Sequence, residues 1–277
     1  MAYTIDRTAI IDKNAKLDKN VTVAAYAVIE AGTKIGSGTT IGAHSVIKKG
    51  TTLGINNTLA EGVVIGGAPQ DVTFSPADES FVTIGNHNTI REQVTIHRSA
   101  EKGNNTYIGD HNFLMCQCHV AHDVTLGSHV VLANNVLLAG HVSVGDHAFI
   151  SGNVVIHQHV RIGRNVMLTG LIRVSRDAPP FSLVAGYRAC FAGLNFIGMR
   201  RAQISSSDRI LVKKFYREFY SSPRQSAFLA SYSTTSPLIT EIITFIKKSD
   251  RGVLTNRSTV LFEASKSNRD DDDELLL

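Results

Sequence analysis

Hydrophobic residues recur along the chain with a period of six. An Ile, Leu or Val stands at every sixth position from Ile5 to Ile65, again from Ile84 to Ile96, and in twelve consecutive hexads that end at Val174. A six-residue period with two inward-facing positions is typical of a parallel β-helix, in which three hexads close one triangular coil. The pattern predicts a mainly β fold, a prism of about eight to ten coils stacked about 4.8 Å apart.

The repeat also defines the domains. Its frame breaks between 66 and 83, which predicts a loop that leaves the prism, and the repeat ends near Gly186. Beyond it, N-capping serines and hydrophobic residues at helical spacing predict helices within 205–220 and 237–248. We therefore predict three segments: a β-helix at 1–188, a small α-helical domain at 189–257, and an acidic, frayed tail at 258–277.

The formal net charge of +4 conceals a basic region. Residues 160–220 contain eleven Lys or Arg but only three Asp or Glu, which indicates a surface for an acidic partner. Charge alone does not distinguish nucleic acid from an acidic protein or ligand. Three cysteines are too few for a disulfide framework, no apolar run reaches 18 residues, and the N-terminus lacks a secretory pattern. These features predict a cytoplasmic protein without a transmembrane segment.

Seven of the eleven histidines lie between 119 and 159. Because 18 residues make one coil, residues 18 apart should stack, so His111, His129 and His147 are expected to form one column. Each of them, like His87, ends a Gly-x-His sequence at a corner of the prism. Gly and Asp supply tight bends at such corners. We interpret these four histidines as parts of the scaffold.

A second group departs from the repeat. His122 and Asp123 replace the ordinary corner pair, Gly140 stands where the repeat has a side chain, and His157 takes a position that Gly usually fills. One edge of the prism thus gathers, across three coils, His122, Asp123, Gly140, His141, His157, Gln158 and His159. A scaffold without another function has no reason to break its repeat here, so the pattern predicts a functional site.

Three kinds of chemistry could use this cluster. The γ-class carbonic anhydrases, zinc enzymes on the same kind of scaffold, place two histidines five residues apart; no pair here has that spacing, and we predict no metal site. Cys118 stands at an inward position and should be buried and inert as a nucleophile. General base catalysis fits better, with His122 taking a proton, Asp123 fixing its tautomer and a backbone N–H at Gly140 meeting an oxyanion. These parts predict acyl transfer from an activated ester or thioester.

Five segments carry a resemblance to a known family: NTIREQVTIHRS (88–99), HVAHDVTLG (119–127), LAGHVSVGD (138–146), VVIHQ (154–158) and RDAPPF (176–181). They resemble the UDP-N-acetylglucosamine acyltransferases of lipid A biosynthesis, from about residue 5 to 254. The resemblance implies a left-handed β-helix and a homotrimer with active sites between subunits. It implies transfer of a 3-hydroxyacyl chain from acyl carrier protein to the glucosamine 3-OH of UDP-N-acetylglucosamine, with the carrier thioester as donor, no separate cofactor and no nucleic acid.

The resemblance also implies roles for individual residues. His122 matches the catalytic base, Asp123 its partner and Gly140 the oxyanion donor, and 66–83 matches the active-site loop. The implied substrate contacts are Asp71, His141, His157, Gln158, Asn195 and Arg201. Gly170, which should stack on Gly152 in a shallow channel above the coils that hold the base, matches a ruler for acyl-chain length. Four basic residues just beyond the histidine cluster are predicted to dock the acidic carrier protein: Arg161, Arg164, Arg173 and Arg176.

The chain departs from the family pattern at three positions. Thr73 stands where Lys is frequent, Ile197 where an acidic residue is common, and His159 where Phe is usual. The first two would touch the nucleotide sugar, so a 3-amino sugar acceptor, and hence an amide product, stays open. Two other hypotheses also stay open: the N-acyltransferase that acts later in the same pathway, which carries a domain before its β-helix, and a non-catalytic hexapeptide scaffold.

Overall fold

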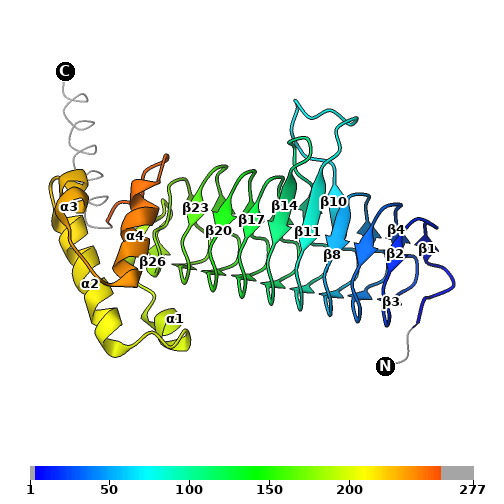
Figure 1. Ribbon diagram of the computed structural model, residues 1–277, viewed down its shortest axis with the longest axis horizontal. Helices are drawn as coiled ribbons and strands as arrows, with labels where there is room; N and C mark the ends of the chain where they lie inside the picture. The colour runs from blue at the N-terminus through cyan, green and yellow to red at the C-terminus, as the bar shows by residue number, and fades with distance from the viewer. Residues whose placement is uncertain (1–3, 257–277) are drawn as a thin grey trace, which may run out of the picture.

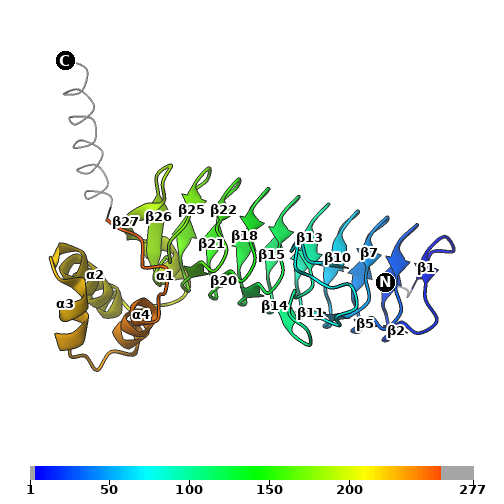
Figure 2. The ribbon, with the colours of Figure 1, turned by 90° about the horizontal axis from the view of Figure 1, so that it is seen from above.

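The computed structural model describes residues 4–256. The predicted tail at 258–277, together with residue 257, lies outside the described residues. Figure 1 shows a long prism of stacked coils with the helices gathered at one end, and Figure 2 shows the same arrangement from above. The fold is a left-handed parallel β-helix with a small helical region near the C-terminus, as predicted.

Short strands from successive coils form three sheets, numbered here in the order in which the chain first enters them. Sheet 1 contains β1 (Ile10–Ile11), β4 (Val28–Ile29), β7 (Val46–Ile47), β10 (Val64–Gly67), β13 (Thr95–His97), β16 (His119–Val120), β19 (Leu137–Leu138), β22 (Val155–Ile156) and β25 (Arg173–Val174). Sheet 2 contains β2 (Lys16–Leu17), β5 (Lys34–Ile35), β8 (Thr51–Leu53), β11 (Phe81–Ile84), β14 (Asn105–Ile108), β17 (Thr125–Leu126), β20 (Ser143–Val144) and β23 (Arg161–Ile162). Sheet 3 contains β3 (Thr22–Val23), β6 (Thr40–Ile41), β9 (Thr58–Leu59), β12 (Thr89–Ile90), β15 (Phe113–Leu114), β18 (Val131–Leu132), β21 (Phe149–Ile150), β24 (Met167–Leu168), β26 (Ser182–Ala185) and β27 (Cys190–Leu194).

The strand register shows where the coils are interrupted. Most paired residues are 18 apart, as Val46 and Val64 are. Val64 then pairs with Thr95, 31 positions on, and Thr95 pairs with His119, 24 positions on. The two longer steps contain the excursions at 66–83 and after His97, which project together from the prism in Figure 1.

The hexad pattern is explained by the core and the corners. The periodic Ile, Leu and Val residues point inward and form one continuous core along the prism. Three positions after most of them, the chain turns with a positive φ, as at His111 (56°) and Asp123 (59°). Left-handed backbone is uncommon outside glycine but more accessible to Asn, Asp and His, which explains the corner histidines. The prediction that Cys118 is buried is confirmed.

Four helices follow the prism: α1 (Phe196–Arg201), α2 (Ser206–Ser221), α3 (Gln225–Ser231) and α4 (Pro237–Lys247). Two of them, α2 and α4, occupy the predicted positions, and the Ser205 side chain caps α2 by accepting a hydrogen bond from the Asp208 N–H. The helices share a second core built on aromatic and Ile side chains. Within residues 4–256, no helix is long and apolar enough to cross a membrane.

The boundary between the two parts is less sharp than a cut at 188/189. Strand β27 pairs antiparallel with β26 and extends sheet 3 before the helices begin. After α4 the chain returns to the prism, where the Leu254 N–H donates to the Asp177 carbonyl (2.9 Å) and the Leu254 side chain joins the β-helix core. The helical region is therefore clamped to the last coil from both of its ends.

Candidate active site

The edge between sheets 1 and 2 carries the histidine cluster. The chain crosses this edge after β16, β19 and β22, so three successive coils place their corners one above another. Two side-chain columns result: His122, Gly140 and Gln158 form the first, and Asp123, His141 and His159 form the second. The His141 and His159 rings are stacked with centroids 4.5 Å apart, which confirms the predicted ladder. We call this group the catalytic edge.

His122 and Asp123 form a hydrogen-bonded pair. The distance from His122 Nδ1 to Asp123 Oδ2 is 2.9 Å, and the exposed fractions of the two side chains are 12% and 4%. An ionised Asp123 accepts from Nδ1–H, which leaves Nε2 without a proton and able to accept one. The arrangement is that of a general base with its tautomer fixed by a carboxylate.

The Asp123 carboxylate is held from three sides. Besides His122, it accepts hydrogen bonds from the Ser99 hydroxyl to Oδ1 and from the Ala100 N–H to Oδ2 (3.0 Å). Burial acts to raise the pKa of Asp123, but the hydrogen bonds from Ser99, His122 and Ala100 outweigh it and hold that pKa below its usual range. Asp123 is therefore ionised at neutral pH although it is buried.

Gly140 is required by the position of the His122 ring. A Cβ atom at residue 140 would lie 2.5 Å from His122 Cε1 and 2.6 Å from Nε2, closer than real carbon contacts allow. The departure from the repeat at Gly140 thus has a physical cause, because any side chain would displace the imidazole. Within residues 4–256, nothing accepts a hydrogen bond from the Gly140 N–H. That N–H has no partner of its own among the described residues.

The other members of the catalytic edge lie around this pair. The His141 ring is perpendicular to the His122 ring, with centroids 5.2 Å apart, and His141 Nε2 lies 3.9 Å from Asp123 Oδ2. Ligand-capable atoms of His122, Asp123 and His141 all lie within 4.8 Å of one another, so the three could enclose a cation. His122 Nδ1 and Asp123 Oδ2 are hydrogen-bonded to each other, and the absence of a resident metal stays our prediction.

Two further histidines adjoin His122 and have no role in the sequence-based hypothesis. His97 and His119 pack edge to face with centroids 4.9 Å apart, and His119 Nδ1 lies 2.8 Å from the Thr95 hydroxyl. Burial, together with the neighbouring His119 and His122, lowers the pKa of His97 to about 4, and burial lowers that of His119 as well. Both rings are neutral at pH 7. Their signal in the sequence is their presence in the family-like segments 88–99 and 119–127.

The excursion at 66–83 brings Asp71 toward the same edge. Asp71 Oδ1 accepts hydrogen bonds from the Thr73 hydroxyl (2.7 Å) and the Thr73 N–H (2.8 Å). These bonds from Thr73, followed by the charges of His122 and His141, lower the pKa of Asp71. Asp71, a predicted substrate contact, is therefore near His122 and His141, and Thr73, a departure from the family pattern, orients its carboxylate.

Asn195 and Arg201 lie elsewhere in the chain. They line a groove of about 580 Å³ between α1 and the outer face of sheet 3, with His129, His147 and Ile197 also in its wall. Asn195 caps α1 by accepting from the Gly198 N–H, and it donates to the Asn165 carbonyl (both 2.9 Å). One chain therefore does not unite all of the predicted substrate contacts with His122.

The histidines interpreted as scaffold form the predicted column. His87, His111, His129 and His147 stack along the edge between sheets 2 and 3, with neighbouring centroids 4.8–4.9 Å apart and nearly parallel planes. We call this column the histidine ladder. Its last two members border the groove that contains Asn195 and Arg201, a proximity that the sequence did not indicate.

Gly170 lies on the third edge, between sheets 3 and 1. A Cβ atom there would lie 3.2 Å from the Gly152 carbonyl oxygen, so the predicted stacking of Gly170 and Gly152 is confirmed. This edge is separate from the one that holds His122, and the outer face of sheet 1 lies between them. On that face the Leu137 and Val155 side chains are 41% and 43% exposed. They are paired on neighbouring strands and form an apolar strip on this face, between the edge of His122 and that of Gly170.

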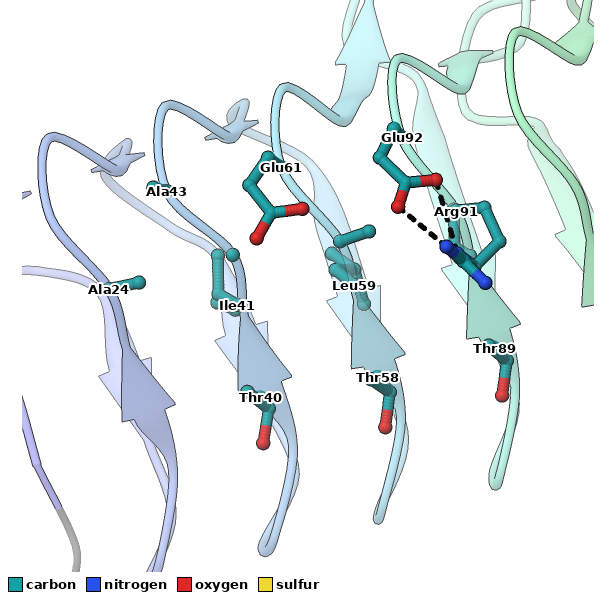
Figure 3. A pocket seen from close by; sticks show the side chains of 13 residues that line it. Ala24, Thr40, Ile41, Ala43, Thr58, Leu59, Glu61, Thr89, Arg91 and Glu92 are labelled. Carbon is teal, nitrogen blue, oxygen red and sulfur yellow. Dashed lines mark hydrogen bonds and ion pairs between the residues drawn. The ribbon is translucent and has the colours of Figure 1, made fainter.

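The same third edge has a hollow of about 480 Å³ near the N-terminal coils, shown in Figure 3. Glu61 and Glu92 lie along it, and Arg91 donates two hydrogen bonds to Glu92. The Arg91 bonds, with one from the Cys116 thiol, lower the pKa of Glu92 to about 2. Glu92 is thus hydrogen-bonded by residues of its own edge, far along the prism from α1.

The four arginines predicted to dock a carrier divide into two pairs. Arg161 donates to the Phe245 and Lys248 carbonyls, and Arg164 donates to both Glu241 carboxylate oxygens (2.7 and 2.8 Å). Both of these arginines hold α4 against the prism. Arg173 and Arg176 are exposed at the far end of sheet 1.

Comparisons with known proteins agree with this geometry. Two family models match the chain: "Udp N-acetylglucosamine O-acyltransferase; Domain 2" at residues 177–254, and "Bacterial transferase hexapeptide (six repeats)" at 14–49 and 105–140. The acyl-(acyl-carrier-protein)–UDP-N-acetylglucosamine O-acyltransferase of Herminiimonas arsenicoxydans is 40% identical over 259 residues, which cover 90% of this chain and 98% of the relative. The corresponding enzyme of Thermodesulfovibrio yellowstonii is 41% identical over 254 residues, with the same coverage.

A solved structure agrees as well. The UDP-N-acetylglucosamine acyltransferase of Bacteroides fragilis superimposes with a TM-score of 0.87 at 36% identity, covering 91% of this chain and all of that one. The sequence relatives extend over both the prism and the helical region, and so does this structural match. The chain belongs to the acyl-(acyl-carrier-protein)–UDP-N-acetylglucosamine O-acyltransferase family.

Proposed function

We propose that this protein transfers a 3-hydroxyacyl chain from an acyl carrier protein thioester to the glucosamine 3-OH of UDP-N-acetylglucosamine, the first step of lipid A biosynthesis. The observation that carries the proposal is the hydrogen-bonded Asp123–His122 pair, whose free Nε2 lies against the backbone of Gly140. The reaction belongs in the cytoplasm, and the carrier thioester supplies the activated acyl group without a separate cofactor.

The chemistry follows from the positions of these groups. His122 Nε2 takes the proton of the sugar hydroxyl as its oxygen attacks the thioester carbonyl carbon. The resulting oxyanion accepts a hydrogen bond from the Gly140 N–H, while Asp123 stabilises the imidazolium. Collapse of the tetrahedral intermediate breaks the C–S bond, and His122 returns the proton to the carrier thiolate. An ester and a free carrier thiol are the products.

The acceptor is an oxygen in this proposal. The curated relatives described above are named O-acyltransferases, which does not favour the amide-forming alternative, the N-acyltransferase of the later step or an inactive scaffold. Thr73, one of the two positions that raised the amide alternative, binds the Asp71 carboxylate from its own chain. Asp71 can then present an ordered carboxylate to a sugar hydroxyl.

A homotrimer explains why one chain separates the predicted contacts. His122 lies on the edge between sheets 1 and 2, whereas Asn195 and Arg201 line the groove against sheet 3. In a cyclic trimer the catalytic edge of one subunit can face the groove of the next, which repeats the same site three times. Arg201 then meets the nucleotide phosphates and His122 the sugar. The histidine ladder borders the site from the groove side.

The acyl chain has a track on the outer face of sheet 1. Leu137 and Val155 form the apolar strip that leads from the catalytic edge toward Gly170. Each methylene that leaves water there contributes about 0.8 kcal/mol. Gly170 leaves the end of the strip open, so a side chain at that position limits the length. Arg173 and Arg176, exposed beyond the strip, are suited to dock the acidic carrier.

Mixed trimers test the shared site. His122→Ala and Arg201→Ala chains with different tags would be co-expressed, and hybrid trimers purified through both tags. Each hybrid contains one interface with an intact His122 and Arg201, so it should recover about one third of wild-type activity, while either parent alone stays far lower. Hybrids no more active than their parents would place the whole site within one chain. Mass spectrometry of the acylated UDP-sugar, before and after hydroxylamine treatment, distinguishes the ester from an amide.

A further inference from the structure

The excursion that follows His97 places Ser99 next to the His122–Asp123 pair. Ser99 is fully buried, and its hydroxyl lies within hydrogen-bonding distance of Asp123 Oδ1. The next residue, Ala100, donates its N–H to Asp123 Oδ2 (3.0 Å), the oxygen that also accepts from His122. The chain thus meets Asp123 from the side opposite the base, 24 residues earlier in the sequence.

The Ser99 proton is directed at the carboxylate. The hydroxyl has one hydrogen, and its two acceptors in reach are Asp123 Oδ1 and the Glu101 carbonyl at 3.2 Å. Asp123 is the charged acceptor of the two, and charge-assisted O–H···O⁻ bonds are the stronger kind. The Ser99 oxygen meanwhile accepts from the Glu101 N–H (3.0 Å), which fixes the direction of its hydrogen.

Hydrogen bonds other than those of the Ser99 hydroxyl also hold the segment in place. The Ser99 N–H donates to the Phe81 carbonyl (3.3 Å), and the Ser99 carbonyl accepts from the Ser80 hydroxyl (2.5 Å). Arg98, one residue earlier, donates its N–H to the Gly67 carbonyl (3.0 Å). These three bonds anchor the stretch to its neighbours independently of the Ser99 hydroxyl, which bonds Glu101 and Asp123.

We propose that Ser99 is a positioning residue for the base. Its hydroxyl holds Asp123 ionised and aimed at His122 Nδ1, so the pair becomes a hydrogen-bonded chain of Ser99, Asp123 and His122. The proposal rests on the proposed role of His122 as the base. Ser99 touches neither substrate nor the reacting atoms, so its effect is exerted through Asp123. A carboxylate that accepts a strong bond on the far oxygen has less freedom to rotate away from the imidazole.

The charged groups around the His122–Asp123 pair determine the pH at which the pair takes up a proton, and the Ser99 hydrogen bond is one of these influences. His122 and His141 face Asp123 directly, and Glu101 follows in the excursion. The other titratable groups near His122 are Asp71, His97, His119 and His159, whose pKa values the His122 charge affects. The pair gains one proton as a unit when its single negative charge is neutralised. A donor to that charge, such as the Ser99 hydroxyl, makes the proton harder to add. Removing the donor should therefore raise the pH at which the pair protonates.

The test is the pH dependence of Ser99→Ala. The acidic limb of the kcat/KM profile should move to higher pH by about half a unit to one unit, and kcat at the optimum should fall about tenfold. The KM values for carrier and sugar nucleotide should stay close to wild type, because Ser99 is buried behind the pair. In NMR titrations of the imidazole nitrogens, His122 should show the same upward displacement without any turnover being measured.

Two further variants make the result decisive. Ser45→Ala removes an equally buried hydroxyl, which donates to the Ala60 carbonyl (2.9 Å) in a distant coil, and leaves Ser99 bonded to Asp123, so its acidic limb should stay in place. Ser99→Cys keeps the volume with a weaker donor and carries the test if Ser99→Ala does not fold. An acidic limb and a His122 titration that stay in place in the folded Ser99 variant would overturn the proposal, as would an equal displacement in Ser45→Ala. A fully active His122→Ala enzyme would instead refute the assignment of His122 as the base. The NMR titration measures the effect of Ser99 on His122 without turnover, so it distinguishes this outcome from a failure of the Ser99 proposal.

Discussion

Two edges of the same prism carry histidines in stacked columns, and they differ in how strictly they repeat. In the histidine ladder, four rings at identical corner positions lie parallel, 4.8–4.9 Å apart, with each φ near 57°. On the catalytic edge the rings of His122 and His141 are perpendicular, a carboxylate replaces one ring, and a glycine replaces one side chain. The backbone geometry is the same at both edges, so function here depends on the exceptions to the repeat.

The exceptions on the catalytic edge explain one another. The Gly140 position is bare because the His122 ring lies over it, and that ring is held there because Asp123 accepts its Nδ1–H. Asp123 in turn stays ionised under burial because the excursion after His97 supplies two donors. The ladder needs no such support, since each of its rings contacts another like itself. Substitutions should therefore have different effects at the two edges.

The largest difference is expected between His122 and His111. His122→Ala should lower kcat by roughly 10²–10⁴-fold, the usual effect of a lost general base, without a change in folding. His111→Asn keeps a residue that tolerates positive φ in the ladder and should retain nearly wild-type turnover. Steady-state assays of both purified variants would measure the contrast. Near-normal turnover of His122→Ala would refute the base assignment, and Asp123→Asn should have a smaller effect than His122→Ala.

A methyl group at Gly140 should come next. Gly140→Ala places a Cβ atom within 2.6 Å of His122 Nε2, so the partly exposed ring must swing away from its position. A misplaced base commonly costs about a hundredfold in rate. Because the ring can move outward, the melting temperature should change little. A variant with wild-type kcat would show that the ring and Gly140 are not packed as described.

Chain-length preference should respond to the third edge. Gly170→Met fills the end of the strip formed by Leu137 and Val155, so carriers with longer chains should lose roughly tenfold or more in kcat/KM. The chemical step with the shortest chains should be unchanged, because Gly170 and His122 lie on different edges. Measuring kcat/KM for a series of 3-hydroxyacyl carriers decides the matter. An unaltered order of preference would reduce Gly170 to a corner residue.

Charge reversal should separate the two arginine pairs. Arg173→Glu or Arg176→Glu should raise the KM for the carrier by about three- to tenfold and flatten its salt dependence. Arg164→Glu should mainly lower the melting temperature, because it places two carboxylates together at Glu241. Titrations with salt from low to moderate ionic strength provide the comparison. Wild-type salt dependence in both exposed variants would move the docking surface elsewhere.

The sequence predicted the parts of the fold that depend on periodicity. Anchors six residues apart located the core, and the 18-residue coil placed His122 under Gly140 and His141 under His159. Where the excursions interrupt the repeat, residues that stack are no longer 18 apart. The contact between Ser99 and Asp123, 24 residues apart, could therefore not be predicted from the repeat. Arg164 and Glu241 are 77 residues apart in different domains, and no local pattern links them. Likewise, Asn195 and Arg201 were assigned by resemblance, which carries no information about the edge they occupy.

The smallest expected effect concerns His97, a buried histidine for which the histidine ladder has no counterpart. Its pKa is about 4 in the folded protein against 6.5 for an ordinary histidine, because burial opposes its charge. Between these values the unfolded chain binds the extra proton, so the stability contributed by neutral His97 is complete above pH 6.5 and is lost as the pH falls toward 4. In His97→Asn this component disappears, and the melting temperature should fall less steeply from pH 7 to pH 4.5 than in wild type. His111→Asn, whose ring is exposed at its corner, serves as the control and should keep the wild-type slope. Parallel curves of melting temperature against pH for wild type and His97→Asn would mean that the pKa of His97 in the folded protein is close to that of an ordinary histidine.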